Sequence, residues 1–183
     1  MDRESSLADR MGKTVHVSPL RYKLKRLLRE HRGSSGGALE DFLVRVANAR
    51  GARVVIGTPE KGSAAFVPSE SALSNEELVV AICQLNCLDR PQMLRLAAQL
   101  VSRNQLDLRK LVRLVTMERA EPVLAEMSRQ ALKIAPQHAA WRVIHDRFGH
   151  FPPLRDKLLH WTRLAEPVME HGRPNASGWR LVA

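Results

Sequence analysis

The chain has 183 residues, and its 29 Lys and Arg against 19 Asp and Glu give a net charge of +10. Its hydrophobic content of 44% is too high for a disordered protein, and its longest apolar run, the six residues from Leu78 to Cys83, is far shorter than the roughly 20 residues of a membrane span. Because two cysteines are too few for a disulfide scaffold and no N-terminal secretory signal is recognisable, we expect a basic globular protein of the cytoplasm with no membrane contact.

The N-terminal part of the chain is predicted to contain an arm and then a helix. Residues 1–17 show no sustained apolar periodicity and are predicted to form a mobile arm. A helix is predicted to begin at Ser18, because serine is a favoured N-cap and Pro19 suits the first helical position. Its apolar stripe repeats at helical spacing and consists of Leu20, Leu24, Leu27 and Leu28. The glycine- and serine-rich run 33–37 ends this helix.

A second helix is predicted over residues 38–50, with Gly51 as its stop. The chain then changes period, because the β-branched run 54–56 and the turn-rich segment that follows it are typical of a hairpin. We predict one small β-hairpin near residues 53–68 and expect it to be the only β structure. Residues 18–72 are thus predicted to form a small helix–helix–hairpin module.

Residues 73–183 are predicted to form a helical domain with an irregular C-terminal tail. Helix start signals recur along it: a capping box formed by Ser74 and Glu77, an N-cap at Asp107, and prolines at positions 91, 122, 136 and 152–153. The last helix is predicted over 154–164, and the tail from Gly172 is predicted to be irregular and docked by Trp179. The predicted fold is mainly α, a helical bundle of about seven to eight helices with one small hairpin.

The excess positive charge is concentrated in two blocks, +5 over residues 1–33 and +4 over residues 89–119. Arginine outnumbers lysine by 22 to 7, and guanidinium groups bind phosphate bidentately. We therefore predict a non-enzymatic protein that binds nucleic acid, DNA or RNA, through basic helix faces. The residues predicted to contact it lie in helices 18–32 and 107–119 and are Arg21, Lys23, Lys25, Arg26, Arg29, Arg32, Arg109, Lys110 and Arg113.

Two DNA-binding arrangements fit parts of this pattern. The three consecutive helices from Ser74 to Glu118 resemble a helix-turn-helix, in which the helix that carries Arg109 would be the recognition helix. Alternatively, the helix ending at Arg50, followed by the predicted hairpin, resembles the end of a winged helix. The chain has only eight Phe, Trp and Tyr residues, and most are expected in the core, so recognition of a duplex or of the backbone is preferred to base stacking on single strands.

The alternative function is that of a helical protein–protein interaction module or regulatory subunit, such as an antitoxin-like or complex-assembly partner. The amphipathic helix 18–32 could then dock its leucine stripe into a partner groove. In addition, Ala131–Pro136 followed by Trp141 is similar to the junction between two tetratricopeptide repeats, over about a dozen residues. That resemblance favours a pair of packed helices there, without a second copy of the repeat.

None of the motifs examined argues for an enzyme, a metal or a cofactor. Gly57 and Gly62 have P-loop spacing, but the required lysine and following helix are missing. Cys83 and Cys87 lack a second ligand pair and are predicted to be buried reduced thiols. The adjacent pair His145–Asp146 lacks well-spaced partners for a metal-dependent phosphohydrolase site. We therefore predict no catalytic or metal-binding residues and no cofactor.

Overall fold

The computed structural model describes residues 18–31, 39–52, 73–84, 91–103, 106–154, 159–171 and 173–181. These residues form a mainly α structure with a small β element. The helices are α2 (Pro19–His31), α3 (Leu39–Ala49), α4 (Asn75–Gln84), α5 (Pro91–Ser102), α6 (Leu108–Met117), α7 (Glu121–Leu132) and α8 (Ala139–Phe148). A short 3₁₀ turn, η2 (Trp161–Arg163), precedes the strands β1 (Ala165–Glu170) and β2 (Arg173–Leu181).

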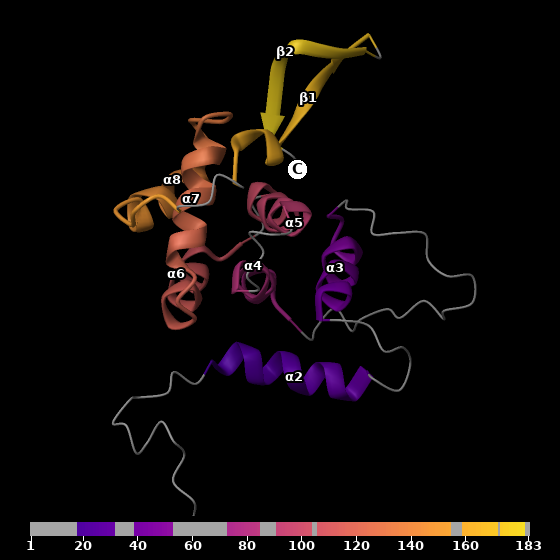
Figure 1. Ribbon diagram of the computed structural model, residues 1–183, viewed down its shortest axis with the longest axis vertical. Helices are drawn as coiled ribbons and strands as arrows, with labels where there is room; N and C mark the ends of the chain where they lie inside the picture. The colour runs from indigo at the N-terminus through magenta and orange to yellow at the C-terminus, as the bar shows by residue number, and fades with distance from the viewer. Residues whose placement is uncertain are drawn as a thin grey trace, which may run out of the picture.

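Helix α4 lies at the centre of the molecule, and α2, α3, α5 and α6 pack around it (Figure 1). It contains the longest apolar run of the chain, and Leu78 to Cys83 are all buried. A helix that is apolar on all sides is stable only when other elements cover it all round. The buried side chains form one cluster that extends from Leu20 to Leu181, and it includes residues on both sides of the predicted domain boundary at 72/73.

Three of the helix start signals read from the sequence, at Ser18, Ser74 and Asp107, are confirmed by their capping hydrogen bonds. The backbone N–H of Arg21 donates to Ser18 Oγ at 3.0 Å, so α2 begins with a serine cap. The capping box of α4 is reciprocal: Ser74 N donates to Glu77 Oε2 at 2.8 Å, and Glu77 N donates to Ser74 Oγ at 3.2 Å. The side chain of Asp107 caps α6 by accepting from the two backbone amides of residues 109 and 110.

The helix stop at Gly51 is confirmed as well. Gly51 has a φ of +85°, a left-handed conformation that glycine adopts at little cost, and Ala52 N closes the end by donating to Ala47 O at 3.0 Å. The pairing of helices suggested near Pro136 also holds, because α7 and α8 pack against each other. Trp141 of α8 is fully buried and donates from Nε1 to Ser102 Oγ at 3.2 Å.

The C-terminal prediction is wrong. Residue 154 and residues 159–160 are not helical, η2 follows, and residues 165–181 form an antiparallel hairpin in place of an irregular tail. This hairpin projects from the helices at the end opposite α2 (Figure 1). Its register places Ala165 opposite Leu181, both buried, so Leu181 anchors the tail; Trp179, predicted to do so, is 41% exposed.

A charged pair also ties the two strands together. Arg180 Nε lies 2.8 Å from Glu166 Oε1, and these two residues are register partners. The expectation that a hairpin near 53–68 would be the only β structure is wrong, because residues 165–181 form a hairpin. Residues 53–68 themselves, and the predicted arm 1–17, lie outside the described residues.

Candidate nucleic-acid interface

Helix α2 presents one apolar face to the protein and one charged face to solvent. Its leucines at 20, 24 and 27 are buried against the helical core, which fixes the rotation of the helix. The residues on the outer side are exposed, and they are Arg21, Tyr22, Lys25, Arg26 and Arg29. Because these three leucines of the predicted stripe are covered by the chain itself, they are not available to enter a partner groove.

The buried carboxylate of Glu118 joins the beginning of α2 to the end of α6. It is only 4% exposed and accepts from Leu20 N at 3.0 Å, from Gln84 Nε2 at 2.6 Å and from the Ser18 hydroxyl. A carboxylate at a helix N-terminus satisfies unpaired amides and interacts favourably with the helix dipole. Glu118 therefore holds the first turn of α2 against the last turn of α6.

Helix α6 supplies a second exposed basic face. Leu111 and Val115 face the core, while Arg109 and Arg113 are exposed. Arg119, immediately after the helix, is exposed in a left-handed conformation with φ of +56°. Since the neighbouring Glu118 accepts from Leu20 N at the beginning of α2, Arg119 lies at the junction of the two helices.

Sequence reasoning did not single out Arg119. Nothing near it signals a helix stop, because no glycine occupies this left-handed position. Its place at the junction depends on the contact between Glu118 and Ser18, which are 100 residues apart. No local signal could have found that contact.

Two of the predicted lysines are engaged by the protein's own carboxylates. Lys23 Nζ lies 2.7 Å from Glu77 Oε2, and Lys110 Nζ lies 3.2 Å from Glu76 Oε2. The acidic start of α4 thus pairs with both basic helices, which reduces the charge that these lysines offer to a ligand. Arg26 also makes an interaction within the chain. Arg32 lies outside the described residues.

When the cations that interact within the chain are left out, a smaller set of exposed cations remains on α2 and on or just after α6. None of them has an acidic partner within the described ranges. We call this set the α2–α6 cationic surface, and its members are Arg21, Lys25, Arg29, Arg109, Arg113 and Arg119. The first three lie on α2, and the others on or just after α6.

Glu76 has a pKa below the ordinary 4.5. Burial by itself raises the pKa of this carboxyl group, but hydrogen bonds from the Ser74 side chain, the Asp107 backbone and Lys110 outweigh it. Glu126 also has a pKa below 4.5. Burial raises the pKa of this carboxyl group, but hydrogen bonds from Gln130 and Arg129 outweigh that effect. Each carboxylate therefore stabilises the fold while it is ionised.

This gives an expected pH dependence of stability. Above pH 4.5 both carboxylates are ionised in the folded and unfolded states, and their stabilisation is fully present. It is lost as the pH falls through the lowered pKa values of the folded state. Urea unfolding midpoints between about pH 3 and pH 7 should fall on the acid side, and Glu76→Gln combined with Glu126→Gln should make that fall shallower. An unchanged acid limb in the double variant would contradict this account.

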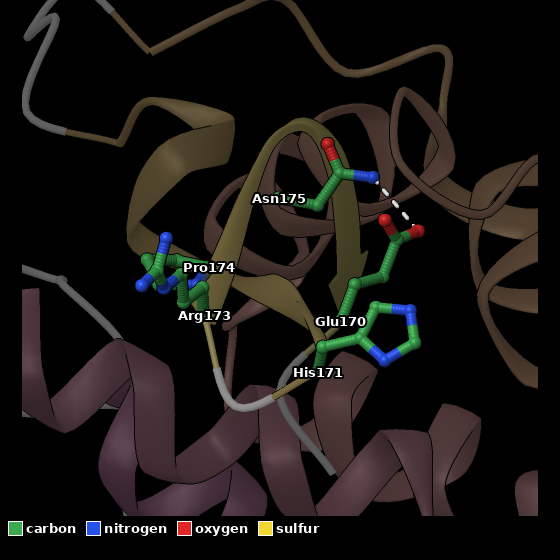
Figure 2. Close-up of a pocket in the computed structure, with 5 residues that line it drawn as sticks. All are labelled: Glu170, His171, Arg173, Pro174 and Asn175. Carbon is green, nitrogen blue, oxygen red and sulfur yellow. Dashed lines mark hydrogen bonds between the residues drawn. The ribbon is translucent and has the colours of Figure 1, made fainter.

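The hairpin turn contains an open depression of about 560 Å³. Figure 2 shows its lining residues, Glu170, His171, Arg173, Pro174 and Asn175, around the turn. The amide of Asn175 donates to Glu170 Oε1 at 2.9 Å, and the other lining side chains are exposed. No buried polar side chain lines this depression, so it lacks the enclosure of a ligand site.

The remaining candidates for chemistry lie apart from one another. Cys83 is buried, with Sγ 3.9 Å from Met127 Sδ, as predicted for an inert thiol, while Cys87 lies outside the described residues. His145 Nδ1 and Asp146 Oδ1 are 4.0 Å apart at the surface. Within the described ranges, no three His, Cys, Asp or Glu residues are grouped to hold a metal ion, and no helix there is long and apolar enough to cross a membrane.

Comparison of the chain with family models, with curated proteins and with solved structures finds no match. Function is therefore inferred from the residues and geometry of this chain.

Proposed function

We propose that the protein binds nucleic acid through the α2–α6 cationic surface, mainly by contacts to the phosphate backbone. One observation supports this proposal above the others. Six exposed cations remain on α2 and on or just after α6 once the internal ion pairs are subtracted, and Glu118 joins the beginning of α2 to the end of α6. Such a surface is suited to a long polyanion, because each phosphate contact releases condensed counterions.

The chemical type of the cations is consistent with phosphate recognition. Five of the six are arginines, whose planar guanidinium groups donate two parallel hydrogen bonds to a phosphate. Phosphate contacts fix position without reading sequence, so the proposal is one of backbone binding by a non-enzymatic protein. A cytoplasmic site of action fits the buried thiol of Cys83, because thiols stay reduced there.

Charge reversal at two places on this surface tests the proposal. Arg109→Glu with Arg113→Glu, and separately Arg21→Glu with Arg29→Glu, should each weaken binding to a short DNA duplex by roughly 10- to 100-fold at 0.15 M salt. All four side chains are exposed, and substitutions at exposed sites usually change stability by only a few tenths of a kcal/mol, so the fold should be retained. Fluorescence polarisation measures the affinity.

The matched control is Arg163→Glu with Arg173→Glu, which changes the net charge equally. Both arginines are exposed; Arg163 ends η2 and Arg173 begins β2, and the hairpin lies at the end of the molecule opposite α2 (Figure 1). The control should change affinity by less than about threefold, since most long-range charge effects are screened at this salt. Equal losses in all three double variants would mean that net charge alone governs binding and would contradict a defined surface.

Protein–protein interaction is the second candidate function, and one observation favours it. The exposed surface of the hairpin carries Met169, which is 56% exposed, and Trp179, which is 41% exposed; their register partners are Pro174 and Pro167, respectively. Exposed apolar clusters mark contact surfaces more often than isolated apolar residues do. If no nucleic acid binds, this part of the hairpin becomes the first surface to examine by Trp179→Ser in sedimentation and pull-down measurements.

A further inference from the structure

Tyr22 occupies the middle of the charged face of α2. Its side chain is 72% exposed, the highest value among the large apolar and aromatic residues of the described chain. Helical spacing places Lys25 three residues on, Arg26 four residues on and Arg29 seven residues on, so that these cations lie on the same face as the ring. The buried leucines at 20, 24 and 27 lie on the opposite face.

The ring has no structural task that accounts for its position. Within the described ranges, Tyr22 makes no ring contact and no side-chain hydrogen bond. Tyrosine is also a weaker helix former than the leucine, lysine and arginine residues around it. The most distinctive property that it adds to this face is a flat, exposed aromatic surface within reach of several cations.

Flat aromatic rings bind the faces of nucleobases, and neighbouring cations hold the flanking phosphates. The face of a base is accessible only when the base is unpaired and unstacked from its neighbour. From the sequence, duplex recognition was preferred because most of the aromatic side chains were expected to lie in the core. That assumption fails for Tyr22, which is exposed on the same helix as these cations.

We propose that the charged face of α2 binds a single-stranded segment of nucleic acid, with one base stacked on Tyr22 and its neighbouring phosphates on Lys25 and Arg29. This inference rests on the proposed function and specifies its ligand. The helix contains one acidic residue, Glu30, against five lysine and arginine residues in its 13 positions, so a polyanion is the ligand favoured by charge. The ring selects unpaired bases, and the cations attract the backbone.

Substitutions at Tyr22 separate stacking from charge. Tyr22→Leu keeps an apolar helix-forming side chain and all the cations but removes the ring, whereas Tyr22→Phe keeps the ring. Polarisation titrations of the full chain should use a fluorescent single-stranded DNA, a single-stranded RNA of the same sequence and the corresponding DNA duplex. Tyr22→Leu should weaken binding to one or both single strands by about 5- to 100-fold and leave the duplex affinity within about twofold, and Tyr22→Phe should match the wild type.

The two single-stranded probes distinguish DNA from RNA as the preferred ligand, since a 2′-hydroxyl contact favours RNA. The stacking inference is overturned if Tyr22→Leu binds single strands as the wild type does, or if it weakens single strands and duplex equally. In that case, a loss of affinity in Arg21→Glu with Arg29→Glu would leave the proposed function standing. Absence of binding to all three probes at low salt would overturn both proposals.

Discussion

Replacing Glu118 by alanine is expected to lower the free energy of unfolding by about 3 kcal/mol. The carboxylate is buried and accepts hydrogen bonds from Ser18, from the backbone of Leu20 and from Gln84. Its removal leaves buried donors without partners, which costs more than the hydrogen bonds themselves contribute. The variant should also bind nucleic acid more weakly, because the first turn of α2 loses its attachment to α6. Urea unfolding followed by circular dichroism measures the first effect, and polarisation measures the second.

Two further variants test the reason given for this effect. Glu118→Gln keeps one carbonyl acceptor but brings an amide donor against other donors, so its stability should lie between those of the wild type and Glu118→Ala. Glu121→Ala removes a half-buried glutamate three residues further on and should cost less than about 1 kcal/mol. If Glu118→Ala were no more destabilising than Glu121→Ala, Glu118 would not be the link between the two helices.

Raising the salt concentration from 50 to 200 mM is expected to weaken duplex binding by about a thousandfold. The α2–α6 cationic surface offers six exposed cations, and six phosphate contacts give a steep decrease of affinity with salt. Tight internal ion pairs such as Lys23–Glu77 release no counterions, so the lysines at 23 and 110 are not counted. A plot of log affinity against log salt concentration gives the number of contacts directly.

The charge-reversal variants should change the slope of that plot as well as the affinity. Each phosphate contact contributes about 0.9 to the slope on a duplex, so Arg109→Glu with Arg113→Glu should reduce it by about 1.8. Arg163→Glu with Arg173→Glu should leave the slope unchanged. A wild-type affinity that hardly depends on salt would contradict binding through phosphates, whatever its absolute value.

The helix starts could be predicted from the sequence because their causes are local. Ser18, Ser74 and Asp107 each cap a helix whose first amides lie two or three residues further along the chain. The same is true of the stop at Gly51, where a positive φ follows directly from the residue type. The longest apolar run of the sequence lies in α4, and all six of its residues are buried.

The C-terminal hairpin was missed because its sequence contains residues that are typical of irregular structure. Pro167 lies in β1, and Pro174 and Gly178 lie in β2, although all three residues usually interrupt regular structure. In a two-stranded sheet both strands are edge strands, where proline is tolerated because half of the backbone groups need no partner. A bulge between Pro167 and Met169 further disrupts the alternation that would have indicated a strand.

The composition of the cationic surface was only partly predictable for a related reason. Summing charges along segments identified the helices that carry exposed arginines, but it could not show which cations have acidic partners elsewhere. Lys23 and Glu77 are 54 residues apart, and their contact depends on how α2 crosses α4. The exposure of Tyr22 likewise became evident only when the leucines fixed the rotation of α2.

The position of the interface is measured most directly by recording amide chemical-shift changes in the isotope-labelled full chain as a short oligonucleotide is added at low salt. The largest changes should fall in residues 18–29 and 107–119, and the hairpin 165–181 should be nearly unaffected. The changes should diminish when salt is raised. Shifts confined to the hairpin, or spread evenly over the helices without a maximum at α2 and α6, would show that these arginines serve only to keep the chain solvated.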